Sequence, residues 1–172
     1  MKQKNLHTQT LEKLFGPISI HIKKQNETVR IVELKDDENY CRTLAIVRFI
    51  DVHGKTLKEA YETILGGELL GKTLLKFNID FDKKYTGSLD IKLPDWLKQD
   101  FKSEHDFGIA FFSNIWVKDD SDNVTKFVFA KVVEIIPEEL KNDFKYKINP
   151  ITSIDSEIKS LFEQAKIELI NV

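Results

Sequence analysis

Cysteine and long apolar runs are scarce in this sequence of 172 residues. Cys41 is its only cysteine, which excludes an internal disulfide and a cysteine-rich zinc site and is typical of a reducing compartment. No apolar run approaches the roughly 20 residues of a membrane-spanning helix, and the start, Met1 to Asn5, lacks the apolar core of a signal peptide. We therefore expect a cytoplasmic protein without a membrane partner.

The chain also has little net charge, few arginines and no cluster of histidines. The formal net charge is −2, so the chain has no overall attraction for nucleic acid, and we expect no nucleic-acid partner. Only three of the 26 basic residues are arginines, so the position of each arginine matters. The four histidines lack the spacing of metal ligands, and we therefore expect no metal site.

Apolar residues are frequent enough to form a core. The hydrophobic share is 41% and the charged share is 31%, both ordinary for a soluble globular protein. The length fits one domain, and neither a repeat nor a low-complexity linker interrupts the chain. We expect a single domain over residues 1–172.

Hydrophobic periodicity predicts several strands between a first and a last helix. The expected helices cover residues 8–15 and 94–101 and an additional amphipathic C-terminal helix lies within 151–170. The expected strands cover residues 18–22, 29–34, 40–52, 75–81, 107–118 and 126–136, with a short strand or helix lead-in at 89–93. Residues 56–65 fit a helix or a strand equally well.

The order of these segments predicts an α+β fold. The polar run Asp119 to Asn123 has the chemistry of a turn, so the two strands on either side of it form the clearest hairpin in the chain. Hairpins produce antiparallel sheets. We expect a mostly antiparallel β-sheet of about six strands with helices packed on one face.

Residues 66–73 match the phosphate-loop pattern G-x-x-x-x-G-K-[ST]. In such a loop Lys72 would contact the outer phosphates of a nucleotide and Thr73 would hold Mg²⁺. The mechanism needs a buried strand before the loop and a helix after it, whereas residues 75–81 alternate like a strand. Glu68 would also place a carboxylate against phosphate. A turn is the favoured interpretation, and nucleotide binding is retained as a second alternative.

Four segments in order carry a resemblance to a known family. They are residues 10–22, Val47-Arg48-Phe49-Ile50 before Gly54, Leu69-Leu70-Gly71-Lys72-Thr73-Leu74, and Val132-Val133-Glu134-Ile135-Ile136-Pro137. Together they resemble the chorismate lyase family, which includes chorismate pyruvate-lyases and related small-ligand-binding domains. The resemblance covers a core of about residues 8–140 and leaves the C-terminal helix unexplained.

The resemblance implies an enzyme that eliminates pyruvate from chorismate, or from a related enolpyruvyl acid, to give 4-hydroxybenzoate without a metal or redox cofactor. On this basis Arg48 would anchor a carboxylate, because a guanidinium binds a carboxylate with two parallel hydrogen bonds. Glu134 would act as an acid, since burial raises a carboxyl pKa. Arg42 would bind a second carboxylate, and the backbone at Leu70 and Gly71 would shape the pocket.

Other interpretations of the same residues remain open. Arg48 and Glu134 could form a structural ion pair. Glu59 and Glu62 lie where the family lyases tend to carry basic residues, which favours a non-catalytic binding or sensor domain for a small aromatic carboxylate. In either case the expected partner is a small aromatic or enolpyruvyl carboxylate, and the expected assembly is a monomer or small homo-oligomer. Cys41 is expected to be a buried structural thiol.

Overall fold

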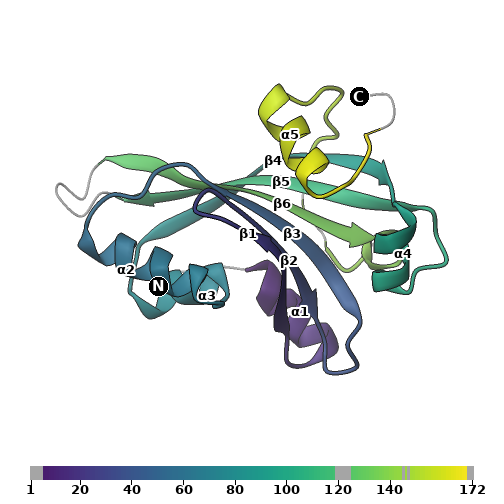
Figure 1. The fold of residues 1–172 in the computed structure, drawn as a ribbon, viewed down its shortest axis with the longest axis horizontal. Helices are drawn as coiled ribbons and strands as arrows, with labels where there is room; N and C mark the ends of the chain where they lie inside the picture. The colour runs from purple at the N-terminus through teal and green to yellow at the C-terminus, as the bar shows by residue number, and fades with distance from the viewer. Residues whose placement is uncertain (1–5, 119–124, 145, 147, 170–172) are drawn as a thin grey trace.

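One antiparallel sheet of six strands, in the order β1-β2-β3-β6-β5-β4, dominates the computed structural model (Figure 1). The structure describes residues 6–118, 125–144, 146 and 148–169. The strands are β1 (Ser19–Gln25), β2 (Val29–Lys35), β3 (Cys41–Phe49), β4 (Phe81–Lys92), β5 (Phe107–Lys118) and β6 (Lys126–Pro137). The helices are α1 (His7–Phe15), α2 (Lys55–Leu65), α3 (Leu70–Lys76), α4 (Asp95–Phe101) and α5 (Ser156–Gln164), and η1 (Glu138–Leu140) is a 3₁₀ turn. The predicted α+β class and six-stranded antiparallel sheet are confirmed.

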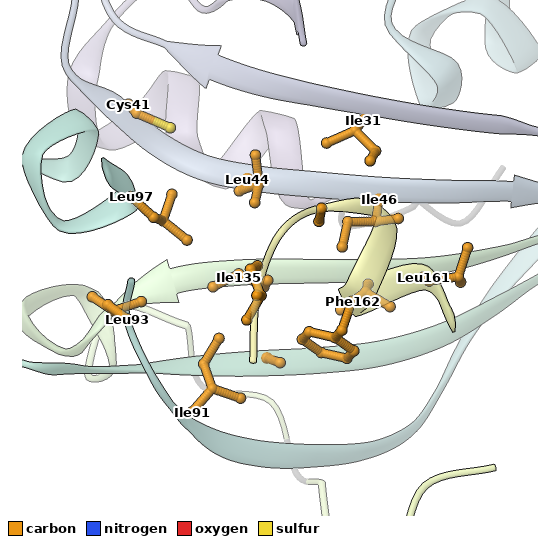
Figure 2. Close-up of a cluster of buried hydrophobic side chains, with 14 of the residues drawn as sticks. Ile31, Cys41, Leu44, Ile46, Ile91, Leu93, Leu97, Ile135, Leu161 and Phe162 are labelled. Carbon is orange, nitrogen blue, oxygen red and sulfur yellow. The ribbon is translucent and has the colours of Figure 1, made fainter. Parts of the chain in front are cut away.

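The sheet is buried on both faces because its central strands are apolar on both. Leu44 and Ile46 of β3 point to one face, here called the α5 face, and Ala45 and Val47 point to the other, the cavity face. Figure 2 shows Leu44, Ile46 and Ile135 of the sheet with Leu97 of α4 and Phe162 of α5 on the α5 face. These buried contacts hold α4 and α5 to the sheet.

Helices therefore lie on both faces of the sheet, and not on one as the sequence predicted. In Figure 1, α1, α2 and α3 lie on one side of the sheet and α5 lies on the other. The packing agrees with this arrangement, because Leu57 of α2 and Leu74 of α3 join Val47 in one cluster, while Leu161 of α5 joins Ile46 in another. The consequence is a layered molecule in which α1 to α3 enclose the cavity face.

The segment after Gly71 is a helix, and its prediction as a strand over residues 75–81 was wrong. Alternation of Leu75, Phe77 and Ile79 suggested a strand, but Leu74 is the fully buried residue and Leu75 is 41% exposed. Helix α3 ends at Lys76, and Asn78, two residues later, has a left-handed φ of 55°, a conformation that asparagine tolerates. The real strand β4 begins at Phe81 and includes the expected short strand. Residues 56–65, left open by the sequence, form most of α2.

The amphipathic C-terminal helix is present but shorter than predicted. Asp155 caps it, since its Oδ1 accepts a hydrogen bond from the Ile158 backbone N–H at 2.8 Å. Its buried face consists of Leu161 and Phe162. The predicted turn at residues 119–123 lies outside the described residues. Within the part of the chain that the structure describes, no helix is long and apolar enough to cross a membrane.

Candidate functional site

A partly open cavity lies between the cavity face of the sheet and helices α1 and α3. Its walls are mainly apolar, formed by residues such as Leu6, Val32, Ala45, Val47, Leu70 and Val132. The space that the centre of a water molecule can reach is about 70 Å³. At roughly 10–15 Å³ for each water, this is room for a few waters or for part of a small organic molecule. Three ionisable side chains, His7, Lys83 and Glu134, and the guanidinium of Arg30 also line it.

Arg30 of β2 is buried in this cavity, and no carboxylate of the described residues is hydrogen-bonded to it, although the charge of the Glu68 side chain attracts it. The Arg30 side chain is 2% exposed. Nη1 donates a hydrogen bond to the Glu68 carbonyl oxygen at 2.7 Å, whereas Nε and Nη2 have no partner among the described residues. Burial lowers the pKa of Arg30. Nε and Nη2 form one edge of the guanidinium, which is the fork that binds both oxygens of a carboxylate.

Glu134 of β6 lies elsewhere in the same cavity and is fully paired. Lys83 Nζ is 2.5 Å from its Oε1, the Tyr85 hydroxyl is 3.3 Å from its Oε2, and His7 Nδ1 is 3.5 Å from Oε2. Burial alone raises the pKa of Glu134, but His7 and Lys83, with hydrogen bonds from Lys83 and Tyr85, hold that pKa below its ordinary value. Glu134 is therefore an ionised hydrogen-bond acceptor at neutral pH, contrary to the predicted acid with a raised pKa.

His7 of α1 lies beside Glu134 and is uncharged at neutral pH. Its Nε2 is 2.7 Å from Thr43 Oγ1 and its Nδ1 is 3.1 Å from the Tyr146 hydroxyl. Burial lowers the pKa of His7 from 6.5 to about 4, against the attraction of Glu134. Burial also raises the pKa of Tyr85 and of Tyr146, so both phenols keep their protons.

Strand register sets the distance between Arg30 and Glu134. Arg30 is opposite Val47 and Val47 is opposite Val132, while Val32, Ala45 and Glu134 form the next row on the same face. With strands about 4.8 Å apart and about 6.8 Å per two residues, the two Cα atoms lie about 12 Å apart. The floor between them is apolar. A molecule with one end at Arg30 and a polar group at Glu134 matches this layout.

No protein-family model matches this chain, and no curated protein matches it at a significant level. Among the described residues, no group of three or more histidine, cysteine, aspartate or glutamate side chains could hold a metal. Side-chain chemistry and geometry are thus the basis for any functional proposal.

Three of the five site residues predicted from the sequence line the cavity: Glu134, Leu70 and Gly71. Gly71 lies against α1, because a Cβ on it would be 2.9 Å from Leu6 Cδ1. The close backbone approach expected at Gly71 is therefore present, although it is an approach to another part of the chain.

Arg48 and Arg42 are not in the cavity, which corrects their predicted placement in one pocket with Glu134. Glu134 is opposite Ala45, and Arg48 is three residues from Ala45, so Arg48 points to the other face of the sheet. There its Nε is 2.8 Å from Glu157 Oε1 of α5. Arg42 Nη2 is 2.6 Å from Asp36 Oδ2. The possible Arg48–Glu134 ion pair is also absent, since each residue has a different partner.

Sequence reasoning missed Arg30, Lys83 and His7. Arg30 alternates with Val32 and Leu34 in a strand, which was a usable signal in a chain with three arginines. Lys83 lies just beyond the strand expected over residues 75–81, and His7 precedes the expected start of the first helix. Neither position carries a local signal of function.

The phosphate-loop match lacks the structure that the mechanism requires. Residues 66–69 join α2 to α3 and residues 70–73 already belong to α3, so a helix precedes the matched segment where a buried strand is needed. The expected objection, a strand after the loop, was wrong, because α3 follows. Lys72 Nζ is 2.5 Å from Glu12 Oε1 and Thr73 is buried at 2% exposure. Neither side chain is presented to a phosphate.

Proposed function

We propose that this chain is a chorismate lyase-like protein whose cavity binds a small aromatic monocarboxylate, with Arg30 as the carboxylate anchor. The observation that carries the proposal is the buried guanidinium with Nε and Nη2 unpartnered in an apolar cavity. A buried charge is costly unless it is paired and hydrogen-bonded. A carboxylate satisfies both donors and the charge together.

Charge favours one carboxylate over two. Among the side chains that line the cavity, Arg30 and Lys83 are positive, Glu134 is negative and His7 is neutral at pH 7, so the lining carries one net positive charge, and the Glu68 carboxylate attracts Arg30 from outside the lining. A monocarboxylate neutralises the charge of the lining, whereas a dicarboxylate leaves an excess negative charge in an apolar cavity. The product-like 4-hydroxybenzoate is therefore favoured over chorismate as the tighter ligand.

Glu134 favours a ligand that carries a hydroxyl at the end opposite to its carboxylate. As an ionised carboxylate it accepts hydrogen bonds, and it lies across an apolar floor from Arg30. An aromatic ring fits over Val32, Ala45 and Val132, with the carboxylate at Arg30 and a hydroxyl at Glu134. This arrangement describes 4-hydroxybenzoate and its close analogues.

A lyase reaction is the second candidate function. Because Glu134 is ionised, this reaction would use Glu134 as a base and not as an acid. As a base, Glu134 would take the proton from the ring carbon that bears the hydroxyl of chorismate. The electron pair of that C–H bond forms the new ring double bond while the neighbouring C–O bond breaks, and enolpyruvate leaves and becomes pyruvate. Lys83, 2.5 Å from Glu134, can stabilise the leaving oxygen. The predicted acid role of Glu134 is thus replaced by a base role.

Binding is tested by titrating the purified protein with 4-hydroxybenzoate in a calorimeter. We expect Arg30→Gln to weaken binding about 10- to 100-fold, because a charge-assisted hydrogen-bond pair contributes about 1.5–3 kcal/mol. Arg48→Gln is the matched control, since it removes an arginine from the opposite face and should leave the affinity unchanged. Equal affinity in Arg30→Gln and the wild type would reject Arg30 as the anchor.

Turnover is tested separately by incubating the protein with chorismate and measuring pyruvate and 4-hydroxybenzoate. Pyruvate release by the wild type that is abolished in Glu134→Gln supports the lyase. If the wild type binds 4-hydroxybenzoate but releases no pyruvate, the chain is a binding domain for the aromatic acid.

A further inference from the structure

The chain that follows β6 and η1 crosses the edge of the sheet and adds residues to the site. Phe144 and Tyr146 pack on the cavity face, and Ile151 and Ile154 pack with the α5-face cluster. Between these two pairs the chain runs along β4, where Ser88 N–H donates to the Asn149 carbonyl at 3.2 Å and Ile151 N–H donates to the Ser88 carbonyl at 2.9 Å. We call the described residues of this segment, Phe144, Tyr146 and residues 148–155, the strap. The strap lies outside the segment that resembles chorismate lyases.

Tyr146 is the strap residue that reaches the site. Its ring stacks on Tyr85 with centroids 4.1 Å apart and meets Phe111 edge-on at 5.1 Å. These contacts fix the ring and direct the hydroxyl to His7 Nδ1, 3.1 Å away. The His7 ring in turn stacks on Phe144 of the strap at 4.4 Å. The strap therefore determines both the position and the hydrogen bonding of His7.

We propose that Tyr146 is a positioning residue that acts through His7: its hydroxyl donates to Nδ1, holds the ring in the uncharged Nε2–H form, and so restricts the cavity to singly charged carboxylates. The role in selecting a ligand rests on the proposed function. The role of Tyr146 in the hydrogen bonding of His7 does not depend on the proposed function.

The groups around His7 explain why the Tyr146 hydroxyl matters. From β6, Glu134 Oε2 lies 3.5 Å from the same Nδ1 that contacts Tyr146, so a proton on Nδ1 would form an ion pair with Glu134. From β4, the Lys83 charge opposes that proton, and the Tyr85 hydroxyl occupies Glu134. Under this proposal Nδ1 accepts from the Tyr146 O–H, and from β3 Thr43 Oγ1, 2.7 Å from Nε2, accepts the Nε2–H. The Tyr146 phenol stays protonated, so its O–H is available to donate to Nδ1.

A protonated His7 would change which ligands fit. A ligand with a second carboxylate in place of the 4-hydroxyl would set that carboxylate against ionised Glu134, and like charges at close range repel. An imidazolium beside Glu134 would cancel this repulsion. A neutral His7 therefore keeps dicarboxylates out.

The test follows the His7 ring by NMR in the ligand-free protein between pH 3.5 and 8, with His7→Gln used to assign its signals. We expect His7 to titrate near pH 4 in the wild type, and to titrate about one pH unit higher, or more, in Tyr146→Phe, because Nδ1 then faces Glu134 alone. Tyr146→Phe keeps the stacked ring. Tyr40→Phe, which removes a phenol outside the cavity, should leave the titration of His7 unchanged.

A second experiment compares the affinities of the same variants for 4-hydroxybenzoate and for benzene-1,4-dicarboxylate at pH 5.5. Tyr146→Phe should improve the relative affinity for the dicarboxylate about tenfold, which corresponds to one pH unit of altered protonation. Equal His7 titration in the wild type and Tyr146→Phe would overturn the proposal. If Tyr146→Phe does not fold, ring nitrogen shifts of wild-type His7 decide the question: an unprotonated Nδ1 supports the proposal and an Nδ1–H form overturns it. Failure of 4-hydroxybenzoate to bind the wild type would reject the proposed function, while the His7 titration still decides the role of Tyr146.

Discussion

At the scale of single residues, Arg30 has the features of a group kept for binding and not for stability. It is 2% exposed, and two of its three guanidinium nitrogens lack a hydrogen-bond partner among the described residues. Replacing buried ionic groups with apolar residues of similar volume is often neutral or stabilising. Binding sites commonly trade stability for function in this way.

Arg30→Met tests this trade directly. We expect the free energy of unfolding to rise by about 2 kcal/mol, since Met fills the space without a buried charge. Binding of 4-hydroxybenzoate should be lost in the same variant. Urea unfolding of both proteins, with and without ligand, measures the two effects. A destabilised Arg30→Met would mean that the hydrogen bond to Glu68 is structural, and the argument for a binding role would lose its support.

The residue scale also shows why part of the site was predictable. Alternation along β6 was enough to identify Glu134 as a buried carboxylate. The direction of its pKa shift was not predictable, because the shift depends on Lys83, which is 51 positions away in sequence. Arg48 shares a face with Leu44 and Ile46, as its spacing in the strand indicates, and it lies outside the site because the cavity forms on the face of Ala45 and Val47.

At the scale of elements, the strands were predicted better than the helices that cover them. Strands such as β5 and β6 are runs of twelve residues rich in apolar and β-branched side chains, which is a long signal. Helix α3 has seven residues, too few for its period to stand out from the alternation of Leu75, Phe77 and Ile79. Its helical state depends on packing of Leu74 in the core below α2, and tertiary contacts of this kind override local pattern.

The contact between the strap and Gly87 of β4 leads to a prediction about packing. A Cβ on Gly87 would clash with Ile151 Cγ2, so Gly87→Ala should displace the strap and destabilise the protein by about 1–3 kcal/mol, the range for overpacking. Ile151→Ala removes the clashing atom. The double variant should therefore be more stable than the sum of the two single changes predicts. Denaturant unfolding of all four proteins gives the coupling energy, and simple additivity would show that the strap does not pack against Gly87 in solution.

At the scale of the whole molecule, the site depends on strand order. β6 inserts between β3 and β5, and this brings Arg30 of β2, Glu134 of β6 and Lys83 of β4 to one cavity. The last hairpin was predictable from its turn and alternation, but its position inside the sheet was not, since pairing of β3 with β6 joins segments more than 80 residues apart. The central strands β3 and β6 are apolar on both sides, and helices therefore cover both faces of the sheet.

Burial of His7 leads to a prediction about the acid stability of the molecule. The pKa of His7 is 6.5 when unperturbed and about 4 in the folded protein, so between these values the unfolded chain binds a proton that the folded chain does not. Stability must then fall as the pH decreases through this window. For a single buried histidine with a pKa shift in this direction, the loss between pH 7 and pH 4.5 is on the order of 2 kcal/mol. Glu134 and Glu33 have lowered pKa values, and their contributions are lost at lower pH.

Urea unfolding at half-unit steps from pH 7.5 to 4.5 measures this dependence. His7→Gln keeps an amide that can contact Thr43 and Tyr146 but cannot be charged, so we expect a lower free energy of unfolding at pH 7 and a much flatter decrease toward pH 4.5. His53→Gln is the control, because His53 is exposed at the surface with a 55% exposed side chain. A decrease as steep in His7→Gln as in the wild type would place the acid sensitivity elsewhere. It would also mean that the pKa of His7 in the folded protein is close to its ordinary value of 6.5.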